Sequence, residues 1–156
     1  NVPTPIVWQD KLIVATENNG TRMYAFDAAG KIEPQPLGEH LDLAPDTHTP
    51  VVGGDRLFGV WSQLYCLSLT DGLKELWTAS DEAFFDYATI LATDERLLIT
   101  SQAGELLLID AQADELKILS RLKLFDDENG VYSHSALVGE RLYVRSSSEV
   151  VCLPLK

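Results

Sequence analysis

The 156-residue sequence has few basic residues, only two cysteines and no long apolar run. Its 12 Lys and Arg stand against 24 Asp and Glu, and the net charge of -12 argues against a nucleic-acid partner, because phosphate backbones are bound by basic residues. No apolar run approaches the ~20 residues that cross a bilayer, so no membrane span is expected. No stretch of about 12 residues shows the 3.6-residue period of a helix, which argues against a helical fold.

The sequence does contain an internal repeat. Four segments share a short apolar strand, a polar turn and a second strand that opens with a basic residue and Leu; they begin at Thr4, Thr49, Ala88 and Ser135. The shared leucines, separated by 45, 40 and 45 residues, are Leu12, Leu57, Leu97 and Leu142. Steps of this length are typical of propeller blades, and these leucines are expected in the core between blades.

Each unit continues with one or two further strands. Third strands are predicted to begin at Met23, Leu64, Leu106 and Val150, and fourth strands over 31–37, 73–79 and 115–122. The predicted strands are short, rich in Val, Ile, Leu and Tyr, and bounded by turn residues. A β-sandwich would also be all-β, but matched repeats favour radial blades that pack on copies of themselves.

These observations predict an all-β fold, a β-propeller of four-stranded antiparallel blades with about four blades present. Residues 1–156 are expected to form a single propeller fragment, with repeat units of about 1–44, 45–84, 85–130 and 131–156. Because the fourth unit has no predicted fourth strand, we expect the chain to be part of a larger propeller. Blade edges without a partner are expected to favour self-association.

The repeats resemble those of the pyrroloquinoline-quinone-like β-propellers, which combine a Pro-Val-Val strand, a Gly-Asp turn and a later LYALDxxTGKxxW motif. The similarity is clearest in TPVVGGDRLFGVWSQLYCLSLTDGLKELW, from Thr49 to Trp77, and in MYAFDAAGK, from Met23 to Lys31. The resemblance implies a propeller fold. It leaves the function open, because the family includes quinoprotein dehydrogenases, which bind the quinone with a metal ion, as well as cofactor-free scaffolds and sensor domains.

Two features make the chain more similar to the cofactor-free members of that family, so no cofactor is expected. The dehydrogenases carry two adjacent cysteines, whereas Cys66 and Cys152 are distant in sequence and share a repeat position with Ala25. We expect both to be buried free thiols. The family's docking Trp is present only as Trp77; near its place in other units stand Pro36 and Leu119 or Arg121.

The resemblance implies two alternative functions. The first is a non-catalytic scaffold or binding module for a protein or small ligand, extracytoplasmic as cofactor-free relatives often are. The alternative is a degenerate quinoprotein-type oxidoreductase, or another enzyme with a site at the propeller funnel that uses His48 and His134. The sequence contains no motif of a catalytic nucleophile or a phosphate loop, so no catalytic residue is assigned.

The linkers that lead from one blade to the next are acidic. They cover residues 37–48, 78–87 and 123–134 and contain one base, Lys123, and all three histidines, His40, His48 and His134. Their nine carboxylates belong to Glu39, Asp42, Asp46, Asp81, Glu82, Asp86, Asp126, Asp127 and Glu128. In an antiparallel meander these linkers share one side of the ring, and their field favours a cationic partner.

The residue just before each first strand is equivalent between units and is Pro3, His48, Tyr87 or His134. We predict that a ligand- or partner-binding funnel is lined by Asp46, His48, Asp86, Tyr87 and His134. The other interpretation is that the His and Tyr side chains hydrogen-bond the backbone of a neighbouring blade. No metal is predicted, because the two histidines lack a third ligand and the acidic run 126–130 lacks the spacing of a calcium loop.

Overall fold

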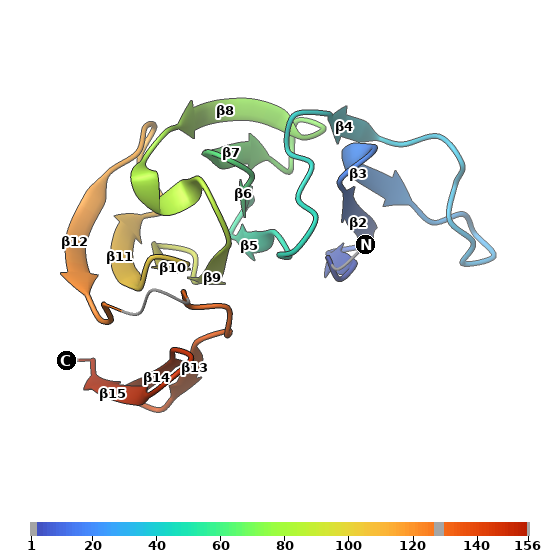
Figure 1. Cartoon of the computed structure of the whole chain (residues 1–156). Helices are drawn as coiled ribbons and strands as arrows, with labels where there is room; N and C mark the ends of the chain where they lie inside the picture. The colour runs from blue at the N-terminus through green and yellow to red at the C-terminus, as the bar shows by residue number, and fades with distance from the viewer. Residues whose placement is uncertain (1–2, 127–129, 156) are drawn as a thin grey trace.

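The computed structural model describes residues 3–126 and 130–155 of the chain. It contains four antiparallel sheets, each built from strands that are consecutive in sequence (Figure 1). Three sheets have four strands and the last has three. A short 3-10 helix, η1 (Glu82–Phe84), joins the second sheet to the third. No helix of the described residues is long and apolar enough to cross a membrane.

The strands follow the predicted repeat. The first sheet consists of β1 (Ile6–Trp8), β2 (Lys11–Thr16), β3 (Gly20–Ala25) and β4 (Gly38–His40). The second consists of β5 (Val51–Gly53), β6 (Arg56–Val60), β7 (Leu64–Ser68) and β8 (Lys74–Ala79). The third consists of β9 (Ala88–Ala92), β10 (Arg96–Ser101), β11 (Glu105–Asp110) and β12 (Ile118–Lys123). The fourth consists of β13 (Ala136–Val138), β14 (Arg141–Arg145) and β15 (Val150–Pro154).

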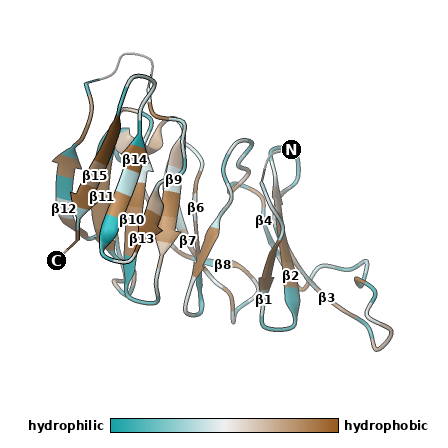
Figure 2. Cartoon of the chain, turned by 90° about the horizontal axis from the view of Figure 1, so that it is seen from below, coloured by the Kyte–Doolittle hydropathy of each residue, from teal (hydrophilic) through white to brown (hydrophobic). Residues whose placement is uncertain are grey.

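The four sheets form an arc, with the first sheet at one end and the fourth at the other (Figure 1). Figure 2 shows the sheets standing side by side, with apolar residues along their strands. We call the face that a sheet turns toward the next one its forward face, and the opposite face its rear face. In the first contact, Ile13 and Met23 on a forward face pack with Leu57 and Leu67 on the next rear face. The chain is therefore a partial β-propeller, as predicted.

The same contact recurs between the later sheets, because alternate residues of a strand point to opposite faces. Phe58 and Cys66 pack with Leu97 and Ile109 between the second and third sheets. Of the four shared leucines, three are fully buried on rear faces: Leu57, Leu97 and Leu142. The prediction is wrong for Leu12, which is only partly buried, because no sheet of the described residues packs on the rear face of the first sheet.

The fourth strand of the first sheet starts later than the sequence suggested. The prediction of a strand over 31–37 is wrong, because that segment has only one isolated bridge and β4 begins at Gly38. Pro34 and Pro36 explain the difference, since proline has no N–H to donate to a neighbouring strand. The fourth strands predicted for the second and third units are confirmed as β8 and β12.

Trp77 links the second sheet to the third. Its side chain is buried, and the indole N–H donates to the carbonyl oxygen of Ala113 at 3.1 Å. The strand register places Gly38 and Ser120 at the equivalent positions of the other two sheets, rather than Pro36, Leu119 or Arg121. Glycine is needed at position 38 because an added Cβ would lie 2.0 Å from the carbonyl oxygen of Gly72, in the turn between β7 and β8.

The prediction of two buried thiols is confirmed for Cys66 and wrong for Cys152, which is exposed. Each cysteine pairs, across the strands, with the residue that follows the shared Leu of its sheet. In the first sheet the residue at the equivalent pairing position is Met23 rather than Ala25. Both cysteines therefore lie on forward faces. The third sheet covers Cys66, whereas no sheet of the described residues covers the forward face that carries Cys152.

In the native protein we expect one thiol to react quickly with a disulfide reagent and the other slowly. Burial raises the pKa of the Cys66 thiol to about 12, so almost no reactive thiolate forms there at neutral pH. Thiol counting should show the fast reaction lost in Cys152→Ser and kept in Cys66→Ser. Two fast thiols in the native protein would contradict the burial of Cys66.

Candidate binding site on the linker face

The linkers between sheets and the turns between second and third strands share one side of the arc, here called the linker face. A cavity of about 550 Å³ opens on it. The cavity is lined by four of the five residues predicted for the funnel, Asp46, His48, Asp86 and Tyr87. Its other lining residues are Thr47, Trp61, Ser62, Phe85, Gln102 and Tyr132. The structure thus brings together residues from separate linkers, while their functional role stays a prediction.

The 3-10 helix η1 orients one wall of this cavity. The carboxylate of Asp81 caps it by accepting the backbone N–H of Ala83 at 3.0 Å. Phe84 at its end is fully buried in the core between the second and third sheets. Its neighbour Phe85 is 58% exposed, and Asp86 and Tyr87 follow it into β9. One aromatic residue therefore fixes the segment, and the next ones face the cavity.

His48 forms a buried, uncharged part of the wall. Its side chain is 4% exposed, and its Nε2 accepts the backbone N–H of Val60 at 3.1 Å. Burial lowers the pKa of His48 to about 4, while the nearby carboxylate of Asp46 acts in the opposite direction. The imidazole is therefore neutral at neutral pH. Val60 belongs to β6 of the same sheet, so this bond differs from the predicted bond to a neighbouring blade.

Tyr87 is held beside Tyr132 by Gln102. The Gln102 side-chain oxygen accepts the Tyr87 backbone N–H at 3.2 Å, and its amide nitrogen donates to the Tyr132 hydroxyl at 2.9 Å. The two tyrosine rings lie 5.7 Å apart between centroids. Burial raises the pKa of Tyr87, which keeps its phenol protonated. Gln102 thus joins segments that lie 15 and 30 residues from it in the sequence.

His134 does not line the cavity and is exposed. Its two neighbours fix the backbone instead: Ser133 donates to the carbonyl oxygen of Arg145 at 2.7 Å, and the Ser135 hydroxyl lies 2.7 Å from that of Thr100. A positive charge on His134 would also disfavour protonation of His48. His134 therefore acts on His48 electrostatically but does not line the cavity with the other four predicted residues.

Sequence reasoning missed the aromatic character of this site. Trp61, Phe85 and Tyr132 all line the cavity, with exposed fractions of 37%, 58% and 60%. Their positions did carry a signal, since Phe85 and Tyr132 belong to the linkers and Trp61 directly follows a second strand. Aromatic residues in the linkers and turns therefore pointed to this cavity as well as the carboxylates that were selected by their charge.

Several of the carboxylates that were predicted for the linkers already have cationic partners, and one of them, Glu39, lies on β4. Glu39 lies 3.4 Å from Arg22, Asp81 pairs with Arg121, and Asp126 lies 3.9 Å from Lys123. All three cations lie on strands β3 and β12, and the count over linkers included only one of them, Lys123. In contrast, Asp46 and Asp86 take part in no ion pair within the described part of the chain. Asp127 and Glu128 lie outside the described residues.

The residues present do not fit the quinone site of the dehydrogenases. Cys66 and Cys152 lie in different sheets, so they cannot form the pair of adjacent cysteines that the resemblance would require. Over residues 3–126 and 130–155, no three or more His, Cys, Asp or Glu side chains are grouped so that they could hold a metal ion. No chemistry of a bound quinone is therefore derived for this chain.

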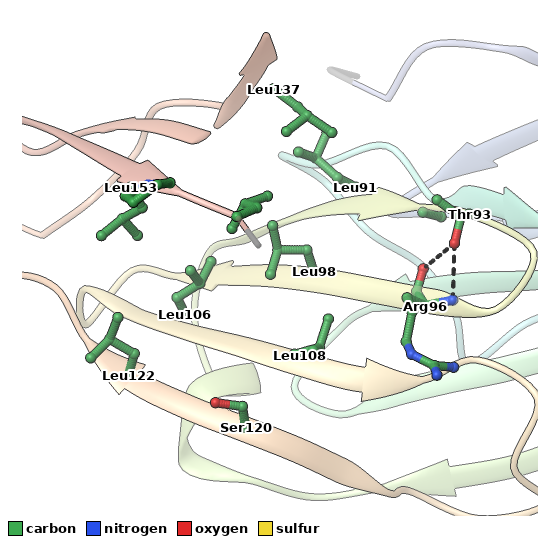
Figure 3. Close-up of a pocket in the computed structure, with 13 residues that line it drawn as sticks. Leu91, Thr93, Arg96, Leu98, Leu106, Leu108, Ser120, Leu122, Leu137 and Leu153 are labelled. Carbon is green, nitrogen blue, oxygen red and sulfur yellow. Dashed lines mark hydrogen bonds between the residues drawn. The ribbon is translucent and has the colours of Figure 1, made fainter. Parts of the chain in front are cut away.

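A second cavity, of about 480 Å³, lies between the third and fourth sheets. Figure 3 shows its apolar walls, where leucines of the third sheet face Leu137 and Leu153 of the fourth. Leu122 of β12 is 48% exposed there because the fourth sheet has no strand opposite it among the described residues. This cavity reflects incomplete packing between two sheets, and it lacks the carboxylates of the linker face.

No protein-family model and no curated protein sequence matches the chain. Solved structures do match it. The computationally designed Ika4 protein has a TM-score of 0.74 and 9% identity over 100% of this chain and 92% of that one. BamB from Moraxella catarrhalis has a TM-score of 0.63 and 18% identity over 96% of this chain and 41% of that one. Apo AztD from Citrobacter koseri has a TM-score of 0.65 and 13% identity over 98% of this chain and 44% of that one.

The chain thus spans less than half the length of BamB and of AztD. Identities this low show the fold alone, because one fold carries many functions. What they establish is that residues 3–126 and 130–155 form part of a β-propeller.

Proposed function

We propose that the protein is a non-catalytic binding module whose linker face docks a basic protein segment or a cationic ligand. The observation that carries this proposal is the cavity on the linker face, whose lining, among the residues that the structure describes, includes two carboxylates, Asp46 and Asp86, and no Lys or Arg. His48 adds no positive charge there, because its low pKa keeps it neutral. A negative field in a concave site raises the local concentration of cations and steers them toward it.

The propeller supports this function by its construction. Rigid sheets position linkers and turns that can vary in sequence, and binding residues commonly lie on such loops. The net charge of -12 gives the whole chain a long-range attraction for basic partners. As part of the same proposal, we infer that the chain is related to the cofactor-free branch of the quinone-like propellers. We also infer that its location is extracytoplasmic.

A synthetic decapeptide of Lys and Arg is expected to bind the chain at about 10 mM salt and to lose at least about tenfold in affinity at about 150 mM, because the Debye length falls from ~30 Å to ~8 Å. The double variant Asp46→Asn, Asp86→Asn should weaken binding about tenfold at low salt, since it removes the two charges of the cavity. Isothermal titration calorimetry measures both effects.

The matched control removes the same number of negative charges from the opposite side of the sheets. Asp55 and Glu115 are exposed and lie in the turns before β6 and before β12. The variant Asp55→Asn, Glu115→Gln should keep most of the affinity for the decapeptide. If both double variants lose the same affinity, the peptide senses only the net charge and the linker face is not a binding site.

A further inference from the structure

We infer that the cavity on the linker face recognises an organic cation, an alkylammonium or guanidinium group held against aromatic rings, and not merely any positive charge. This inference rests on the proposed function and names the chemistry that its site selects. The site has two components. An inorganic cation would use only one of them, and an apolar ligand would use only the other. One component is a group of aromatic side chains, and the other is the pair of carboxylates.

The aromatic component consists of four residues, Trp61, Phe85, Tyr87 and Tyr132, all of which line the same cavity. Three of them keep a third or more of their surface exposed, although apolar rings are normally covered. They come from three separate segments, so their meeting follows from the fold and not from one aromatic stretch. The face of an aromatic ring attracts a cation within about 6 Å of its centre, and Trp does so most strongly.

The two tyrosine rings, and the backbone that carries Phe85 and Trp61, are held in position before any ligand arrives. Gln102 binds the backbone of Tyr87 and the hydroxyl of Tyr132, which fixes the two tyrosine rings 5.7 Å apart. Phe85 is fixed by the buried Phe84 beside it and by the capped helix η1. Trp61 donates its backbone N–H to the carbonyl oxygen of Gln63 at 2.9 Å, which closes the turn that presents it. Preorganised rings lose little conformational entropy when a ligand binds.

The charges of the cavity complete the recognition. Asp46 and Asp86 line it, no Lys or Arg is among its described lining residues, and His48 is neutral. Asp46 is half-buried, so its carboxylate is less screened than a fully exposed one. A metal ion would need three or more closely placed ligands, and no such group occurs in the described residues. An organic cation needs only this arrangement of rings with an acid nearby.

The volume of about 550 Å³ is within the range of small-ligand sites, which is roughly 300–1,000 Å³. Two sources supply the same chemistry: a free quaternary ammonium compound, or the Lys or Arg side chain of a bound protein. In both cases the apolar part of the ligand contacts the rings while its charge faces Asp46 and Asp86. The experiment must therefore test the shared chemistry first and then separate the two sources.

The first measurement compares choline with its uncharged isostere, 3,3-dimethylbutan-1-ol, by calorimetry and by NMR titration of the 156-residue chain. We expect choline to bind at least about tenfold more tightly, because only the charged compound gains from the rings and carboxylates together. Equal binding of the two would overturn the inference, since it would show a merely apolar cavity. Absence of choline binding up to about 50 mM, with blocked arginine also failing to bind, would overturn it as well.

The second measurement tests the rings. Trp61→Leu and Tyr132→Leu should each weaken choline binding about fivefold or more, whereas Trp61→Phe should restore most of it because it retains a ring face. Trp8→Leu is the matched control, since Trp8 lies in the first sheet and lines a different cavity. Circular dichroism confirms that each variant folds. Unchanged affinity in folded Trp61→Leu and Tyr132→Leu would remove the aromatic part of the inference.

The third measurement separates the two sources and keeps this inference distinct from the proposed function. Arginine and lysine with blocked amino and carboxyl groups are titrated against choline for the same NMR shifts. Tighter binding of the blocked amino acids assigns the cavity to a protein side chain, and tighter binding of choline assigns it to a free ligand. If the decapeptide binds through Asp46 and Asp86 while Trp61→Leu changes nothing, this inference fails and the proposed function stands.

Discussion

Replacing Trp77 by Ala is expected to lower the free energy of unfolding by about 3–5 kcal/mol, a large part of the 5–15 kcal/mol that stabilises a typical domain. The ring is 8% exposed, packs 6.2 Å from Phe58 between ring centroids and bonds the third sheet through Ala113. The substitution opens a cavity between the second and third sheets and leaves the carbonyl oxygen of Ala113 without this donor.

Urea denaturation measures the change, and Trp61→Ala is the control. Trp61 is 37% exposed on the linker face, so its replacement should cost about 1 kcal/mol or less. A loss of less than about 1 kcal/mol in Trp77→Ala would contradict the account of how these two sheets pack. Equal losses in the two variants would show that burial does not distinguish the two tryptophans.

The second large effect is a loss of stability in acid that depends on His48. Burial lowers the pKa of His48 to about 4 in the folded protein, compared with 6.5 for an ordinary histidine. The unfolded chain therefore takes up a proton that the folded protein excludes. The stabilising contribution is fully present above pH 6.5 and is lost as the pH falls toward 4. Since each pKa unit is worth ~1.4 kcal/mol, the loss reaches about 2 kcal/mol at pH 4.5.

The variant His48→Gln isolates this effect, because the Gln side-chain oxygen can still accept the backbone N–H of Val60. Asp46 and His134, the titratable neighbours that act on His48, are the same in both proteins. Urea denaturation at pH 7 and pH 4.5 should show that the original protein loses about 2 kcal/mol more than the variant. Equal losses in the two proteins would mean that His48 is not a buried neutral histidine.

The repeat and the fold class were readable from the sequence because the shared leucines recur at one position per sheet. Their spacing depends on local strand and turn lengths, which a pattern of residues reports directly. The pattern does not report which sheet, if any, packs on each face of a given sheet. Leu12 and Cys152 occupy repeat positions like those of Leu57 and Cys66, yet they are less buried because of the sheets on which they lie.

The alignment of third strands failed in the first unit for a related reason. The motif MYAFD resembles LYCLS, but the register places Met23, rather than Ala25, opposite the residue after the shared Leu. The third strand of the first unit already begins at Gly20, before the motif, and a turn closed by Asp27 follows it. The residue matched to Cys66 by motif is therefore Ala25, whereas the residue matched by strand pairing is Met23, two positions earlier. Because of this shift, the motif alignment also did not identify Gly38, which pairs with Met23, as the counterpart of Trp77.

The candidate site was predicted in part. Chain topology placed Asp46, His48, Asp86 and Tyr87 on one side, and the structure brings these four to one cavity. His134 does not line this cavity; its side chain is exposed while its serine neighbours hold the backbone, and its role in binding stays a prediction. The neutral state of His48 and the ion pairs of Glu39 and Asp81 depend on three-dimensional contacts, so no count of linker charges could supply them.

The most direct test of the binding function is a residue-by-residue NMR titration of the isotopically labelled chain with the basic decapeptide at low salt. The account predicts that the backbone shifts concentrate on the residues that line the cavity and on their linkers: Asp46, Trp61, Phe85, Asp86 and Tyr132. The turns that contain Asp55 and Glu115 should stay unchanged. Shifts spread evenly over both sides of the sheets, or confined to those opposite turns, would contradict a binding site on the linker face.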